Sequence, residues 1–70
     1  MMPLALADMG EERIVKQVNG SPEVKKHLEN LGFVSGSCVS IVNTFAGNII
    51  VSIKDTRVAV SREMAQKIMV

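Results

Sequence analysis

Three apolar alternations in the second half of the chain constrain the fold more than any other feature. They run over residues 38–43, 48–54 and 57–61, and each is followed by polar or turn-forming residues. A two-residue period is that of a β-strand with one buried face. We therefore predict three antiparallel strands, joined by a hairpin loop at 44–47 and a short polar connection at 55–56. The side chains predicted to face the core are Val39, Ile41, Ile49, Val51, Ile53, Val58 and Val60.

One α-helix is predicted over residues 22–31. Ser21 is a favoured N-cap residue, and Pro22 occupies the first helical position, where proline is common. Gly32 can adopt the left-handed conformation that ends many helices, and Phe33 is the apolar residue that often folds back on such a cap. A β-branched replacement of Gly32 should therefore be among the costlier changes in the chain. The apolar stripe of this helix consists of Val24, Leu28 and Leu31.

The remaining segments supply shorter pieces of structure. Residues 4–7 alternate leucine and alanine and indicate a short N-terminal strand or an ordered arm, whereas residues 12–18 break the strict period and suit a bulged strand. Gly36 marks a turn before the second long strand. A helical turn near 62–67, capped by the serine before it, should lead into a last short strand at 68–70.

Together these elements describe a mainly β protein. Five or six short antiparallel strands, one helix and tight turns in 70 residues suit a small, strongly bent barrel that forms a single domain over residues 1–70. The helix should flank or plug one end of the barrel. A domain of this size rarely holds a cleft of ~300 Å³ or more, so a stand-alone enzyme is not expected.

Charge and composition argue against several classes of function. The net charge of +1, from eight basic and seven acidic residues, lacks the cationic excess of a typical nucleic-acid-binding protein. A single cysteine rules out an internal disulfide and fits a reducing, cytoplasmic setting. The longest apolar run, Met1–Ala7, is far shorter than the roughly 20 residues of a membrane span. We expect a soluble cytoplasmic protein that neither binds nucleic acid nor inserts into a membrane.

Few residues are suited to catalysis or metal binding. His27 is the only histidine, and the sequence places no nucleophile or carboxylate beside it. Cys38 lies eleven positions away, without the spacing of a closed metal site, and is interpreted as a small buried hydrophobe. The acidic group Asp8, Glu11 and Glu12 is interpreted as solvated surface beside a turn. No catalytic, cofactor-binding or metal-binding residue is therefore predicted.

The two aromatic residues have different expected roles. Phe33, after the helix, is assigned to the core, whereas Phe45 stands in the predicted hairpin loop with Thr44, Ala46 and Gly47. Two phenylalanines cannot furnish an aromatic groove for proline-rich peptides or a stacking platform for bases. A large apolar side chain at a loop tip is a candidate anchor for a protein partner. The alternative is that the loop folds back over the barrel and buries Phe45, and the sequence favours neither.

Two segments of the chain resemble the signature motifs of one protein family. Residues 27–39 read HLENLGFVSGSCV and resemble the L-x-x-(L/M)-G-(F/L)-x-P-G-x-x-V signature of the FeoA family, bacterial ferrous iron transport protein A. Residues 58–65, followed by 68–70, are similar to that family's closing pattern A-(L/V)-x-x-x-x-A-x-x-(I/L)-x-V. With the opening segment and the 12–18 strand in matching positions, the resemblance covers nearly the whole chain.

Two positions depart from the family pattern. Ser35 replaces the usual proline before Gly36, which we expect to loosen the turn into the strand that starts at Cys38. Ser61 stands where an arginine is common, which leaves any electrostatic docking in the closing segment to Arg62. Neither change should affect the fold.

The resemblance implies an SH3-like barrel that acts in the cytoplasm, at the inner face of the membrane. Its implied partner is the membrane ferrous iron transporter FeoB, whose soluble portion is a GTP-binding domain, and the chain itself would hydrolyse no GTP. Activation or inhibition of transport, nucleotide dependence, and a monomeric or dimeric state all stay open. The residues we assign to partner binding are Phe45, Thr44, Ala46, Gly47 and Arg62.

A second hypothesis is that the protein is metal-responsive and itself binds iron(II) or another divalent transition metal. It would do so as a monomer or across a dimer interface, pooling His27, Cys38 or acidic residues of two chains.

Overall fold

The structure is a computed structural model that describes residues 1–70. Six strands, two α-helices and one 3₁₀ turn follow one another along the chain. In order, they are η1 (Leu4–Leu6), β1 (Glu12–Ile14), β2 (Gln17–Val18), α1 (Pro22–Asn30), β3 (Cys38–Phe45), β4 (Asn48–Ile53), β5 (Thr56–Ser61), α2 (Arg62–Ala65) and β6 (Ile68–Met69).

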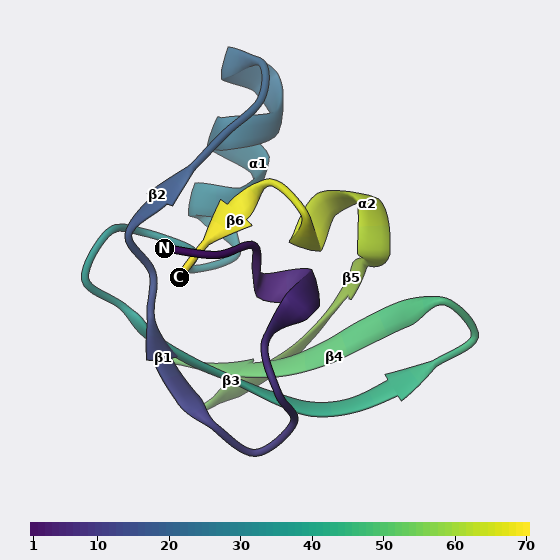
Figure 1. Ribbon diagram of the computed structural model, residues 1–70. Coiled ribbons are helices and arrows are strands. Elements are labelled where there is room, and N and C mark those ends of the chain that lie inside the picture. The colour runs from purple at the N-terminus through teal and green to yellow at the C-terminus, as the bar shows by residue number, and fades with distance from the viewer.

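The strands form two antiparallel sheets. The larger sheet has the order β1-β3-β4-β5, and the smaller one pairs β2 with β6. In Figure 1 the four-stranded sheet occupies the lower part of the molecule, while β2, β6 and both helices lie above it. The prediction of a mainly β protein with five or six antiparallel strands and one principal helix is therefore confirmed.

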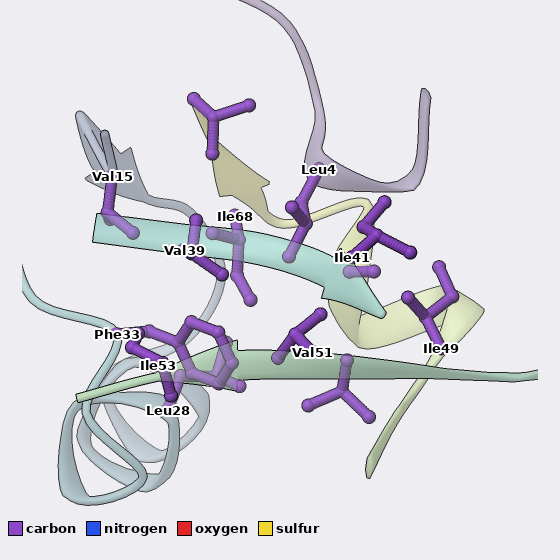
Figure 2. Packing of buried hydrophobic residues seen from close by; sticks show 13 residues of the cluster. Leu4, Val15, Leu28, Phe33, Val39, Ile41, Ile49, Val51, Ile53 and Ile68 are labelled. Atoms are coloured by element: carbon purple, nitrogen blue, oxygen red, sulfur yellow. The ribbon is translucent and has the colours of Figure 1, made fainter. Parts of the chain in front are cut away.

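One apolar cluster fills the space between the two sheets and the helices. Every side chain predicted to face the core is buried except Val58, which is half-buried at the margin of the cluster. Leu28 and Phe33 enter the cluster from the helix side (Figure 2). The thirteen buried members are Leu4, Val15, Leu28, Phe33, Val39, Ile41, Ile49, Val51, Ile53, Val60, Ala65, Ile68 and Val70.

Local hydrogen bonds define both ends of α1. The Ser21 hydroxyl accepts a hydrogen bond from the Val24 N–H at 3.3 Å. At the other end Gly32 has a φ of +110°, and the Phe33 N–H donates to the Leu28 carbonyl at 3.0 Å. Together with the bond from the Gly32 N–H to the Glu29 carbonyl, this is a Schellman motif, which satisfies the last carbonyls of the helix. The helix ends at Asn30, one residue earlier than predicted.

The N-terminal half differs from the sequence-based expectation in two places. Residues 4–6 form a 3₁₀ turn rather than a strand, because Leu6 and Ala7 donate back to carbonyls three residues earlier. The bulged strand expected over 12–18 is two strands in different sheets. The Val15 N–H donates to the carbonyl of Ser37, the residue before β3, at 2.8 Å. The N–H of the next residue, Lys16, donates to the carbonyl of Met69 in β6, also at 2.8 Å. The break in apolar periodicity thus marks the point where the chain passes between the sheets.

The β3–β4 turn is tighter than predicted, and the β4–β5 turn has the predicted length but begins one residue earlier. Residues 46 and 47 alone connect β3 to β4, and residues 54 and 55 alone connect β4 to β5. All four of these residues have positive φ, between 50° and 82°. Two-residue turns of this kind match the twist of the flanking strands. β3 therefore continues to Phe45 and β5 begins at Thr56, beyond their predicted limits, whereas β4 ends one residue earlier than predicted, at Ile53. The short helix α2 likewise ends at residue 65, before the predicted limit of 67.

The two ends of the chain pair with each other. Met2 and Val70 exchange backbone hydrogen bonds of 2.9 and 2.8 Å, and Pro3 forms a bridge with Met69. Figure 1 shows the N- and C-termini side by side. Val70 is buried in the core, so the last residue of the chain contributes to packing as well as to pairing.

The β4–β5 turn offers a stabilising substitution. Asp55 has a φ of +62° at the second turn position, where the β3–β4 turn has Gly47. Because glycine adopts this conformation without steric strain, we expect Asp55→Gly to raise the free energy of unfolding by about 0.5–1 kcal/mol. Urea denaturation monitored by circular dichroism measures the change. Thr56→Gly, one residue later in the strand, is the control and should lower stability; equal effects of both variants would contradict the explanation.

Candidate docking site

The β3–β4 hairpin projects beyond the rest of the barrel. β1 pairs with β3 only as far as Ser40, and one further bridge joins Met9 to Ile41. The register of β3 against β4 shifts between Ile41 and Asn43, which indicates a bulge at this point. Beyond the bulge, β3 is paired with β4 alone and forms the outer side of the hairpin, whereas β4 stays paired with β5 up to Asn48 (Figure 1).

Phe45 stands at the tip of this hairpin. Its side chain is 73% exposed, the highest value of any large hydrophobic residue in the chain. It pairs with Asn48, next to the two-residue turn of Ala46 and Gly47, and all of these residues are exposed. The alternative in which the loop buries Phe45 is wrong, because a two-residue turn is too short to fold back over the barrel. Thr44, predicted to lie in the loop, belongs to β3 and is also exposed.

The register brings Arg62 to the same end of the sheet. Phe45 pairs with Asn48, and Asn48 pairs with Ser61, so these residues form one row across β3, β4 and β5. Neighbouring strands lie about 4.8 Å apart, which puts the backbones of Phe45 and Ser61 about 10 Å from each other. Arg62 follows directly, is exposed and forms no ion pair, since the chain's one ion pair joins Arg13 to Glu11.

Sequence reasoning missed other exposed apolar side chains. Leu6 in η1, Met9 in the following turn and Ile14 in β1 are all exposed, as is Met1. Their positions carry no local signal, because exposure here depends on which segments the fold packs over them. None of them is aromatic, and none projects on a hairpin.

The candidate metal ligands lie on different elements. Cys38 is exposed rather than buried, and its thiol donates to a carboxylate oxygen of Glu12 at 3.8 Å. The prediction of a buried Cys38 is therefore wrong: the residue alternates with Val39 and points to the outer face of β3. His27 is exposed on α1. No three histidine, cysteine or acidic side chains converge within the chain.

Two surface depressions are present. One, of about 190 Å³, lies on the outer face of the large sheet, below the ~300 Å³ of a typical small-molecule site. It is lined by Glu12, Cys38, Val39, Ser40, Ser52, Lys54 and Asp55. The other, of about 520 Å³, is bordered by β2, α1 and the segment after the helix, with charges of both signs from Lys16, Lys25 and Glu29.

Comparison of the sequence with models of known protein families identifies the family of this chain. The model of the FeoA domain family matches residues 2–70. The chain belongs to the FeoA domain family. The resemblance seen in the sequence motifs is thus confirmed over almost the full length.

Individual FeoA proteins are similar to the chain in sequence and structure. A Methanocaldococcus jannaschii protein named "Putative Fe(2+) transport protein A" is 37% identical over 70 residues, spanning 100% of this chain and 85% of that protein. The crystal structure of the iron uptake regulatory protein FeoA has a TM-score of 0.89 at 25% identity, over 97% of this chain and 90% of that one.

FeoA from Stenotrophomonas maltophilia, solved in complex with zinc and called an SH3 domain protein, has a TM-score of 0.85 at 23% identity. The match covers 99% of this chain and 88% of that one. The SH3-like fold that the resemblance implied is confirmed. Neither helix of the present chain has the length and hydropathy needed to cross a membrane.

Both departures from the FeoA signature have structural roles. The Ser35 hydroxyl donates to the Lys16 carbonyl at 2.9 Å, and the turn is closed by a 3.0 Å bond from the Ser37 N–H to the Val34 carbonyl. The turn is thus tied to the neighbouring segment, contrary to the expected loosening. Ser61 accepts a hydrogen bond from the N–H three residues later, at 3.1 Å, and so caps α2.

Proposed function

We propose that this FeoA-family chain is a non-catalytic accessory protein of ferrous iron uptake. It docks on the cytoplasmic part of the membrane transporter FeoB, which includes a GTP-binding domain, and modulates transport. The family assignment and the relative named for Fe(2+) transport support a role in this process. In this proposal the chain acts in the cytoplasm and reaches the membrane only through its partner.

The observation that carries the proposal is the exposed phenylalanine on a projecting hairpin. Contact residues that dominate protein interfaces are enriched in aromatic side chains and arginine, and they occupy the centre of the contact. Phe45 and Arg62 are both exposed at one end of the large sheet, and Arg62 has no ion-pair partner. Burying a phenylalanine side chain in a partner's pocket contributes about 1.5–3 kcal/mol. A carboxylate on the partner could then pair with Arg62 at the edge of the contact.

Pull-down of FeoB tests this proposal. The purified chain is immobilised and exposed to intact FeoB and to its soluble domain, with and without GTP. We expect Phe45→Ala to weaken binding by about tenfold or more, because it removes the apolar anchor. Its thermal midpoint should stay close to that of the parent protein, since the side chain is exposed.

Ile14→Ala is the matched control. Ile14 is also an exposed apolar residue, but it pairs with Cys38 at the other end of β3. Phe45 lies seven positions beyond Cys38 along β3, about 23 Å away at 3.3 Å per residue. The control should bind FeoB normally. Equal binding by Phe45→Ala and the parent protein would refute docking through the hairpin tip.

A further inference from the structure

β5 is a long, regular edge strand of the large sheet. It pairs with β4 over all six of its residues, without a bulge, and no strand pairs with its other side (Figure 1). The opposite edge of the sheet is formed by β1, which has only three residues. Natural proteins usually protect such edges with charged side chains, a proline, a bulge or a covering segment. Of these devices β5 has only one, the single charged residue Arg57.

The free backbone groups of this edge can be identified from the register. Thr56 forms the pair next to the two-residue turn, where the two strands exchange hydrogen bonds. Bonded and non-bonded pairs alternate in an antiparallel ladder, so Val58 and Val60 also bond to β4. Arg57 and Ala59 therefore direct their N–H and C=O groups away from the sheet. Both residues are exposed, and neither takes part in any hydrogen bond of the turns, loops or caps.

The side chains along the edge favour a particular pattern in a docked strand. Arg57 lies on the outer face, exposed and without an ion-pair partner, and Arg62 follows at the end of the strand. Val58 points the other way and is half-buried at the margin of the core. A strand placed beside β5 would thus gain from carboxylates on the outer face and apolar side chains on the inner face.

We propose that the β5 edge is a docking site for an extended segment of a partner protein, in which acidic and apolar residues alternate. The segment adds to the large sheet as an antiparallel fifth strand. Its backbone bonds to the free groups of Arg57 and Ala59, and a carboxylate pairs with Arg57. This inference rests on β5 alone and does not require that the partner be FeoB or that the hairpin tip dock.

Charge disfavours a second copy of the chain as the occupant. A symmetric antiparallel pairing of two β5 strands would bring the Arg57 and Arg62 side chains of both copies to one seam, with no carboxylate inside the strand to offset them. Like charges on adjacent strands are destabilising. An acidic segment instead meets both arginines with opposite charge.

Hydrogen exchange by NMR tests the site with synthetic peptides. The probe is a seven-residue peptide of alternating glutamate and valine, with both ends capped. In the free protein the amides of Arg57 and Ala59 should exchange quickly, and those of Val58 and Val60 slowly. Saturating peptide should slow exchange at Arg57 and Ala59 by about tenfold or more, as new strand hydrogen bonds form.

Two N-methylated peptides distinguish strand addition from simple charge attraction. In the proposed pairing the glutamates lie opposite Arg57 and Ala59, so their N–H groups face β5 and those of the valines face solvent. Methylating the glutamate nitrogens should abolish binding, whereas methylating the valine nitrogens should not. Equal binding by the two peptides overturns the proposal. So does protection of Arg57 and Ala59 that rises with protein concentration alone, because it would identify a second copy as the occupant.

Two substitutions test the protein side. Arg57→Glu should weaken binding of the glutamate–valine peptide by about tenfold, and Lys25→Glu, the same charge change on α1, should not. Ala59→Pro removes an N–H that is free in the isolated protein and should abolish binding with little change in thermal midpoint. If Ala59→Pro fails to fold, the two charge-reversal variants still test the proposal. Equal peptide binding by Arg57→Glu and Lys25→Glu overturns it.

Discussion

Phe33→Ala is expected to lower the free energy of unfolding by about 3–5 kcal/mol. Phe33 is the largest fully buried side chain in the chain, and its removal leaves a cavity between α1 and the large sheet. At 0.05–0.15 kcal/mol per residue, a domain of this length has a total stability of about 4–10 kcal/mol. The substitution therefore removes about a third or more of the total stability, and the urea midpoint should fall sharply.

The second phenylalanine provides the control. Phe45 is the only other aromatic residue and is mostly exposed, so Phe45→Ala should change stability by no more than about 0.5 kcal/mol. Urea denaturation followed by circular dichroism compares the two variants directly, because the chemical change is identical. A similar loss of stability in both would show that the hairpin tip is packed in solution, and docking through it would lose its basis.

Gly32→Val is expected to cost about 2–3 kcal/mol. The residue closes the Schellman motif of α1 at a φ of +110°, a conformation that β-branched side chains avoid. The Cβ itself fits: it would lie 3.7 Å from Cγ2 of Ile53, an ordinary van der Waals distance. Backbone strain at this φ is therefore the expected cause of the penalty, and it affects the cap that connects α1 to Phe33.

A graded series of substitutions separates backbone strain from side-chain packing. Asparagine accepts positive φ more readily than valine, so Gly32→Asn should lose clearly less stability than Gly32→Val. The urea midpoints of the two variants compare their stabilities directly, provided that their m-values are the same. If both substitutions cost the same, strain at position 32 is not the cause.

The proposed hairpin-tip and edge sites share the outer face of the large sheet. Phe45 and Ser61 belong to one cross-strand row, and Arg57 lies four residues before Ser61 on β5. A single partner could occupy the tip and the edge at once, with an apolar pocket over Phe45 and an acidic strand along β5. The peptide experiment and the FeoB pull-down address the two contacts separately.

Local sequence determined the parts of this protein whose hydrogen bonds are local. The cap at Ser21 and the glycine at position 32 form hydrogen bonds within a few residues of the helix ends. Both could be predicted from the sequence for that reason. The inward faces of β3 and β4 follow from a period of two, which any strand with one buried face imposes. The family motifs depend on the same local features and indicated the FeoA family correctly.

Tertiary structure alone decided the features that depend on distant partners. The chain passes between sheets at Val15 because that residue finds its hydrogen-bond partner beside β3, more than twenty residues away. Cys38 is exposed and Val58 only half-buried because of what does or does not pack over them. The strand order leaves β5 at an open edge, and no residue of β5 encodes that position. Pairing between strands is a non-local choice, so the docking edge could be found only once the sheet was assembled.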